Sequence, residues 1–233
     1  PDIINEQSTI DVVSIQSNES VPELKEKESR IIVCDTVTTE DIDRRLDELL
    51  EKKYLKLVAG CAGLADRLVE KIKLKRNKEQ KFKQTQGMYV ACGSLNKITE
   101  KQVEYAQKNG GFERIHLTME QKLIPEYYKT AAGKHFMESV VALCREKKKV
   151  IVDTFDQDDT KEEFLKVHQI PKESVRFRIS DSHGCIVDEI VSQKTDVTIL
   201  MTGGDTLMGY MKKIGCTQIE PLCEIEQGVV VSS

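Results

Sequence analysis

Short apolar runs alternate with amphipathic segments along most of this chain. Six runs have the length and β-favouring composition of buried strands: 30–35, 54–60, 87–93, 113–118, 149–155 and 196–201. Between and after them, apolar residues recur at helical spacing in 38–53, 64–74, 99–108, 131–147, 161–168, around 186–191 and in 207–214. This alternation predicts an α/β fold: a mostly parallel sheet with helices on both faces, in three layers.

The pattern also suggests how the chain divides. Residues 1–29 are polar and poorly patterned except at 10–15, so we interpret them as a linker leading in from a missing N-terminal domain. Residues 30–233 form the predicted nucleotide-binding domain, with an extended segment at 216–224 near a sheet edge. The first residue is not Met, which suggests a fragment or a trimmed chain.

Composition narrows the classes of partner. A net charge of −4 and the absence of Trp give no basic surface or stacking platform for nucleic acid. No apolar stretch is long enough to span a membrane, and the N-terminus lacks the features of a signal peptide. The seven cysteines are scattered without metal-ligand spacing, so buried free thiols in a reducing, cytoplasmic compartment are expected. A homodimer is the candidate assembly.

The end of the last predicted strand is the strongest candidate for a ligand site. The run 196–201 stops at Thr202-Gly203-Gly204-Asp205-Thr206, and a helix-compatible segment follows. Glycines allow close approach of the backbone to a phosphate, and a helix N-terminus favours negative charge. Asp205 could hold a metal, and Thr206 offers a hydroxyl and an amide. The alternative is an ordinary tight turn with Asp205 or Thr206 as the helix cap.

Other strand ends offer weaker candidates. Gly93-Ser94 follows a predicted buried strand, and Thr99 opens the next predicted helix, so these hydroxyls could contact a nucleotide or simply cap the helix. Asp153 is expected to be a solvated carboxylate rather than a metal or hydroxyl partner. The segment 60–63, Gly-Cys-Ala-Gly, is expected to pack a helix closely on the sheet. The chain contains no Walker-type phosphate loop, no GxGxxG dinucleotide motif and no nucleophile elbow.

Five segments together resemble the four-carbon acid sugar kinase family over about residues 9–232. They are CDTVTTEDI (34–42), LVAGCAGLADRL (57–68), ACGSLNKITEKQV (91–103), LMTGGDT (200–206) and CEIEQGVVVS (223–232), in the order typical of that family. The resemblance implies a kinase that uses ATP and Mg²⁺ to phosphorylate threonate, erythronate or 3-oxo-tetronate. It implies nucleotide contacts at Ser94, Gly203, Gly204, Asp205 and Thr206, with Asn96, Thr99 and Gly228 as further candidates and Glu224 near the site.

The sequence departs from the family pattern in three places. The sugar-binding N-terminal domain and a glycine-rich segment beyond residue 233 are missing, and Cys61 stands where Ser is common. We therefore expect the catalytic base and the sugar site to lie outside these residues, and the chain alone to be inactive. Two alternatives stay open: a non-catalytic nucleotide-binding module, and a different sugar kinase with a Gly-Gly-Asp phosphate turn, such as a phosphofructokinase-like enzyme.

Overall fold

The computed structural model describes residues 2–25, 28–74, 82, 85–94, 96–156, 160–226 and 228–233. The chain forms two compact units, Pro1–Glu79 with Glu224–Val230 and Gln80–Cys223 with Val231–Ser233. Strands on the two sides of residue 29 pair with each other within the first unit. The division into a linker and a nucleotide-binding domain from residue 30 stays a prediction.

The described residues of the first unit form a two-stranded parallel sheet and three helices. Strand β1 (Asp11–Ile15) pairs with β2 (Arg30–Cys34), and the helices are α1 (Asp2–Asn5), α2 (Thr39–Glu51) and α3 (Ala62–Lys71). Helix α2 begins at a capping box in which Thr38 and Asp41 satisfy each other's backbone amides. Arg67 joins α3 to α2 through two hydrogen bonds of 2.8 Å to Asp43.

The predicted strand at 54–60 is wrong. These residues follow α2 as turns and irregular backbone, and Leu57 is 94% exposed. The amide of Tyr54 donates to the carbonyl of Leu49 at 2.8 Å, after Lys53 takes a positive φ of 57°. The first residue of this apolar run therefore terminates α2. Its amide binds a carbonyl of the helix and is not available for pairing in a sheet.

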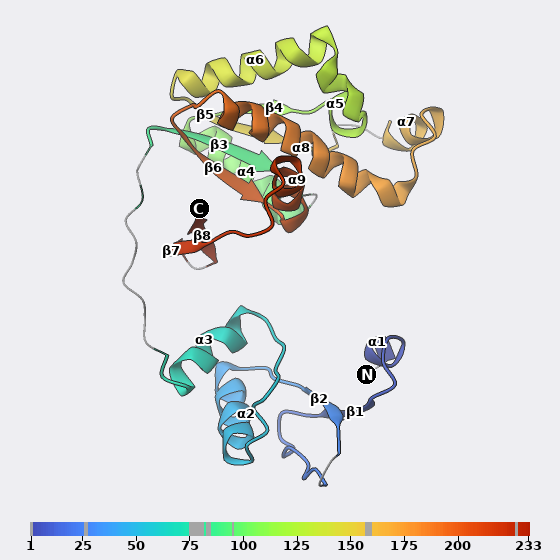
Figure 1. Ribbon diagram of the computed structural model, residues 1–233, viewed down its shortest axis with the longest axis vertical. Helices are drawn as coiled ribbons and strands as arrows, with labels where there is room; N and C mark the ends of the chain where they lie inside the picture. Colours follow the sequence, from blue (N-terminus) through green and yellow to red (C-terminus); the bar gives the residue numbers. More distant parts are fainter. Residues whose placement is uncertain are drawn as a thin grey trace. The chain divides into compact units, whose positions relative to one another are not determined.

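The second unit is built on a four-stranded sheet in the order β4-β5-β3-β6 (Figure 1). Its strands are β3 (Gly87–Cys92), β4 (Phe112–His116), β5 (Lys149–Asp153) and β6 (Val197–Thr202). Every neighbouring pair is parallel. The carboxyl ends of all four strands therefore lie along one edge of the sheet, and four of the six predicted strands are confirmed here.

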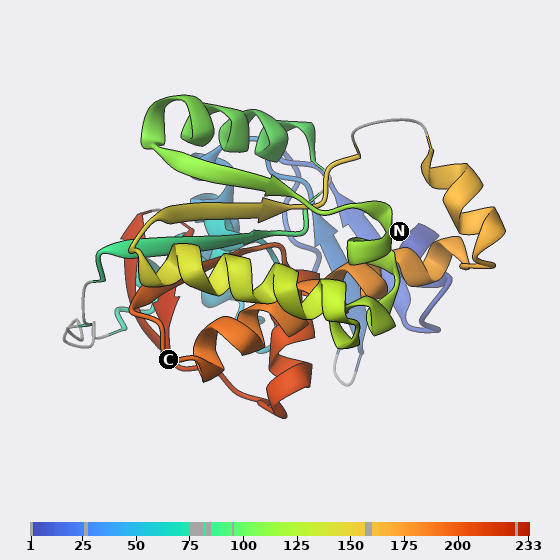
Figure 2. The ribbon, with the colours of Figure 1, turned by 90° about the horizontal axis from the view of Figure 1, so that it is seen from above.

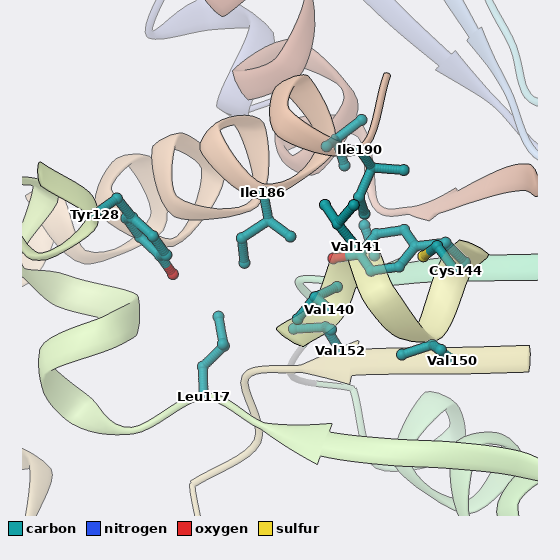
Figure 3. Packing of buried hydrophobic residues seen from close by; sticks show 12 residues of the cluster. Leu117, Tyr128, Val140, Val141, Cys144, Val150, Val152, Ile186 and Ile190 are labelled. Atoms are coloured by element: carbon teal, nitrogen blue, oxygen red, sulfur yellow. The ribbon is translucent and has the colours of Figure 1, made fainter. Parts of the chain in front are cut away.

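Helices cover both faces of this sheet, as predicted (Figure 2). On one face, α4 (Lys97–Gly110) packs Val103 against Val90, Cys92 and Ile151. On the other, α6 (Ala131–Arg145) and α8 (Val175–Ser192) enclose Tyr89 and Ala91, and Figure 3 shows part of this larger cluster. Consecutive strand residues thus enter opposite cores, because side chains alternate along a strand.

Close contact between α8 and α9 (Gly204–Ile214) fixes the last helix of the unit. A Cβ on Gly209 would lie 2.2 Å from the carbonyl oxygen of Ser180, and one on Gly184 would lie 2.8 Å from that of Gly209. Only glycine lets the two backbones approach so closely. The start of α9, where the predicted phosphate turn lies, is therefore held against α8.

The remaining elements are short. They are α5 (Met119–Leu123), the 3₁₀ turn η1 (Pro125–Lys129), α7 (Lys161–Val167), the 3₁₀ turn η2 (Lys172–Ser174), and β7 (Pro221–Glu226) paired with β8 (Val229–Ser232). All seven cysteines are free thiols; Cys92 and Cys144 are buried as expected, whereas Cys61 is exposed. Among the helices of the described residues, none has the length and apolar content to cross a membrane.

Candidate nucleotide site

The glycine turn after β6 leads into α9, whose first backbone amides are not capped by a side chain of the described residues. Gly203 takes φ 106° and ψ 133°, a conformation that side chains rarely adopt, and the described residues provide no side-chain cap for the helix. Thr206 is buried, and its hydroxyl donates to the carbonyl of Thr202 at 3.2 Å. The first amides of α9 are thus left for a ligand or for solvent, with the positive end of the helix dipole behind them.

The loop after β3 meets this turn. A Cβ on Gly93 would lie 2.3 Å from the Thr206 hydroxyl oxygen, so only glycine allows the contact. Further along the loop, the Ser94 hydroxyl donates to Thr99 Oγ1 at 3.2 Å, and Asn96 caps α4 by accepting from the amide of Ile98 at 2.8 Å. The helix begins at Lys97 rather than at the predicted Thr99. The two predicted loops are therefore adjacent, and part of the first has an ordinary capping role.

A cavity of about 510 Å³ lies at this junction. Gly93, Asp205 and Thr206 line it, and α8 with the turn before it completes the wall. This volume falls within the range usual for small-molecule and cofactor sites, about 300–1,000 Å³. Gly203 and Gly204 precede Asp205 in the same turn, whereas Ser94 binds Thr99 and the amide of Asn96, and the Asn96 side chain binds the amide of Ile98. Nucleotide contact by each predicted residue stays a prediction.

The sequence did not predict the wall of the cavity that residues 172–180 form. Lys172 and Arg176 bring positive charge to the lining, and Ser180 donates its hydroxyl to the carbonyl of Asp205. Lys172 also pairs with Glu162 at 2.7 Å, and Arg176 lies over the Phe177 ring at 4.5 Å. The sequence signal was present, because two basic residues flank the start of the long helix, but nothing in it indicated which strand ends this helix would reach.

The topology explains why the cavity lies at these strand ends. After β3 the chain continues into α4 on one face, whereas after β6 it continues into α9, whose Tyr210 packs with the core on the other face. β3 and β6 are neighbours in the sheet. Neighbouring strands whose connections leave toward opposite faces create a crevice outside their carboxyl ends, where ligands bind in open parallel sheets.

The interpretation of Asp153 as a solvated carboxylate is wrong. Asp153 is fully buried at the end of β5, where its two oxygens bind Arg114 Nε at 2.7 Å and His116 Nδ1 at 2.9 Å. Arg114 is 8% exposed, so this is a buried ion pair. Both partners of Asp153 come from the end of β4, which lies beside β5 in the sheet. The order of strands in a sheet depends on tertiary structure and cannot be deduced from the sequence of one strand.

A buried histidine lies next to the Gly93-Ser94 loop. The His183 ring is fully buried in α8, and a Cβ on Gly93 would lie 3.5 Å from its Cδ2 atom. Burial lowers the pKa of His183 to about 4, an effect that the Cys92 backbone and the Asp153 carboxylate offset only in part. The ring is therefore neutral at pH 7 and acts as packing behind the loop.

The last predicted site residue, Gly228, belongs to the first unit. It takes φ 79°, and its amide donates to Glu224 Oε1 at 2.7 Å. Its contact with a nucleotide stays a prediction. Within the described ranges, no group of three or more His, Cys, Asp or Glu residues is arranged to hold a metal ion.

Comparison with known proteins agrees with this architecture. The family model described as "Nucleotide-binding C-terminal domain" matches residues 89–233. Among curated proteins, no sequence matches the chain. The Haemophilus influenzae protein HI1011 of the DUF1537 family is 18% identical with a TM-score of 0.57, covering 89% of this chain and 48% of its own. A candidate tRNA synthase from Salmonella typhimurium LT2 is 13% identical with a TM-score of 0.56, covering 100% and 56%.

A third structure, a DUF1537 domain from Bordetella bronchiseptica with bound citrate in a domain-swapped dimer, is 16% identical, with a TM-score of 0.43 and coverage of 97% and 52%. The chain thus spans about half the length of the solved structures it matches. The α/β fold and the family match define a nucleotide-binding domain. The chain belongs to the nucleotide-binding C-terminal domain family, and the resemblance to the four-carbon acid sugar kinases is confirmed.

Proposed function

We propose that this chain is the ATP-binding part of a kinase that phosphorylates a four-carbon acid sugar of the threonate, erythronate or 3-oxo-tetronate type. One observation carries the proposal: two glycine loops, predicted separately as phosphate sites, touch at Gly93 and Thr206 and border one cavity. The ordered sequence motifs supply the substrate class.

The residues at the junction fit a nucleotide phosphate. The uncapped amides at the start of α9 are suited to its oxygens, and the glycines leave room for close approach. Lys172 and Arg176 line the same cavity and can balance phosphate charge. Asp205 is the carboxylate at the turn best placed to help hold Mg²⁺, which binds mainly through phosphate oxygens and water with one or two carboxylates.

In this proposal the chain binds and orients the nucleotide. Phosphoryl transfer depends mainly on positioning and charge stabilisation, which bound ATP and Mg²⁺ and the surrounding residues provide. The acceptor sugar and the catalytic base come from the part of the enzyme outside these residues, so the chain alone binds nucleotide without turnover. The buried thiols of Cys92 and Cys144 support a reducing, cytoplasmic setting. A homodimer stays a prediction.

The test is phosphate transfer by the full-length protein. ADP formation is measured with ATP, Mg²⁺ and a panel of four-carbon acid sugars, in the wild type and in Gly204→Glu. Apart from its chain neighbours and the backbone of its own helix, no atom of the described residues lies within 4 Å of a Cβ at Gly204. An acidic residue also suits a helix N-terminus, so the variant should fold. Its carboxylate should repel phosphate and abolish turnover.

A second acidic substitution controls for charge on the same helix. Met208 is 61% exposed on α9, and Met208→Glu should leave ADP formation unchanged. ADP formation with one of the acid sugars, lost only in Gly204→Glu, supports the proposal. If the wild type binds ATP but transfers phosphate to none of these sugars, the alternatives of a binding module or a different sugar kinase gain instead.

A further inference from the structure

Two cysteines of the first unit line one cavity. The cavity encloses about 220 Å³ and is bordered by Cys34, the last residue of β2, and by Cys61, the residue before α3. Most of the remaining lining is apolar and comes from α2, α3 and the segment between them. The two thiols therefore face a common space that is separate from the candidate nucleotide cavity, whose lining belongs to the second unit.

Helices α2 and α3 run side by side in the same direction. Arg67 of α3 binds Asp43 of α2 at 2.8 Å, and one turn further along both helices Lys71 binds Asp47 at 2.6 Å. Both pairs join residues 24 positions apart, so the helices advance together. The start of α3 therefore lies beside the start of α2, and the two cysteines belong to the segments that lead into these starts.

The Cys61 side chain is accessible from solvent. Cys61 is exposed, and within the described part of the chain it makes no capping hydrogen bond to α3. A Cβ on Gly63, two residues further on, would lie 3.8 Å from Ile42 Cδ1, so this end of α3 packs directly on α2. Cys61 is thus open to a dissolved reagent and borders the cavity at the same time, which suits it for the first attack.

The Cys34 thiol is half-buried beside a cation. Burial raises its pKa, the Arg45 guanidinium offsets part of that rise, and the carboxylates of Glu48 and Asp35 add to it. Arg45 lines the cavity, and its side chain is held by Glu48 at 2.7 Å and by the carbonyl of Glu19 at 2.9 Å. Cys34 is therefore a protonated thiol at pH 7 that reacts slowly with dissolved reagents. A disulfide already attached within the cavity is held close to it, which favours reaction there.

We propose that Cys61 and Cys34 form a redox-responsive pair, which a low-molecular-weight disulfide oxidises to an intramolecular disulfide. The Cys61 thiolate attacks one sulfur of the reagent, releases one thiol and leaves a mixed disulfide at the cavity. Cys34 gives its proton to solvent and attacks the Cys61 sulfur, which releases the second thiol. In total, two cysteine thiols become one disulfide, and the disulfide of the reagent becomes two thiols that take up the two protons.

The bridge would act within the first unit. It joins the end of β2 to the start of α3 and closes a loop that contains α2 and the irregular segment after it, where Leu57 is 94% exposed. Such a link stabilises a fold mainly by restricting the unfolded chain. In a reducing compartment both thiols stay free, and a rise in the concentration of disulfides forms the bridge. The inference does not depend on the proposed kinase function, because it uses none of the residues that line the candidate nucleotide cavity.

The test is oxidation of the folded 233-residue chain by hydroxyethyl disulfide, followed by blocking of the remaining thiols, digestion with trypsin and mass spectrometry. Trypsin places the two cysteines on the separate peptides 31–44 and 57–67, so the bridge appears as one linked mass. The variants are Cys61→Ser and Cys34→Ser, with Cys216→Ser in the second unit as the matched control. Thermal unfolding of the reduced proteins confirms that each variant is folded.

We expect the linked peptides to be the main disulfide product in the wild type and in Cys216→Ser, and dithiothreitol should reverse the link. In Cys34→Ser the reagent should stay attached to Cys61. In Cys61→Ser, Cys34 should react about tenfold or more slowly than Cys61 does in Cys34→Ser, because Cys34 is less exposed. The oxidised wild type should unfold at a higher temperature than the reduced protein, and neither single variant should show this shift.

Three results would overturn the proposal. The first is that Cys34 and Cys61 remain unlinked, and the second is that Cys61 pairs with another cysteine or another chain instead. The third is a linked product that unfolds at the same temperature as the reduced protein, since the bridge would then place no restraint on the first unit. Each of these results leaves nucleotide binding and phosphate transfer untouched, so failure here is distinct from failure of the proposed function.

Discussion

The two halves of the sheet's carboxyl edge differ in composition: backbone groups and glycines line one half, and charged side chains line the other. At the ends of β3 and β6, glycines and uncapped amides border the candidate nucleotide cavity. The buried Thr206 hydroxyl there donates to the backbone carbonyl of Thr202. At the ends of β4 and β5, buried charged side chains bind one another, with Asp153 at their centre. A backbone-built site depends on close approach, whereas a charge-built site depends on complete pairing, so substitutions should affect the two halves differently.

The largest effect should come from the charged half. Asp153→Ala leaves Arg114 buried without its carboxylate, and breaking a buried pair on one side costs about 3–5 kcal/mol. Urea unfolding of the chain measures the loss in the free energy of unfolding. Glu113 is the neighbour of Arg114 in β4 and pairs with Lys148 at the surface, so Glu113→Ala should cost much less. Equal losses in the two variants would contradict the comparison.

The next effect is a pH dependence from His183, which lies behind the glycine loop. Its pKa is about 4 in the folded state, below its value near 6.5 in the unfolded chain, so the unfolded state binds more protons between these values. The free energy of unfolding should therefore rise with pH from about 4 to 6.5, by up to about 1.4 kcal/mol per pH unit from this residue, and level off above.

Unfolding measured across pH in His183→Gln should show a flatter profile in this window. His135 is largely exposed on α6, so His135→Gln serves as the matched substitution and should keep the wild-type slope. A slope that His183→Gln leaves unchanged would show that another group carries the pH dependence.

A smaller loss should come from the contact between the two glycine loops. Gly93→Ala forces a methyl group to within 2.3 Å of Thr206 Oγ1, and overpacking of this kind costs about 1–3 kcal/mol. Thr206→Ala removes the clashing atom, so the double variant should recover part of the loss. Strictly additive free energies of unfolding in this double-mutant cycle would mean that the loops do not touch.

The smallest effect should separate two adjacent glycines. Gly203→Ala places a side chain at φ 106° and should cost about 1–2 kcal/mol, whereas Gly204→Ala, in open space at the first position of α9, should stabilise by about 0.4–1 kcal/mol. Thermal unfolding of the two variants, which change the same atoms, decides whether the backbone conformation of the turn is as described. A matching shift in both would speak against it.

Local sequence predicted much of this fold for a physical reason. Strands β3, β5 and β6 are mostly apolar runs because the sheet is covered on both faces. Gly203 is required by its positive φ, and Gly93 by its close approach to Thr206. The run 54–60 has the same apolar appearance, but its first residue completes a helix end instead. Composition alone does not distinguish these two uses of a short apolar segment.

The parts that sequence missed depend on strand order and helix placement. Asp153 becomes a buried ion-pair centre only because β4 lies beside β5, and Arg176 reaches the glycine turn only because α8 packs against α9. The residues concerned lie 39 positions apart in the pair of Arg114 with Asp153. Local periodicity carries no information at that range, whereas the glycine turns are encoded within a few residues.

The central claim is that the turn at 203–206 binds the phosphates of a nucleotide. Its most direct test is calorimetric titration of the 233-residue chain with ATP and Mg²⁺, in parallel with Gly204→Glu and Met208→Glu. We predict saturable binding in the wild type and in Met208→Glu, and an affinity weaker by about tenfold or more in Gly204→Glu. Absence of binding in the wild type, or equal affinities in all three proteins, would contradict the claim.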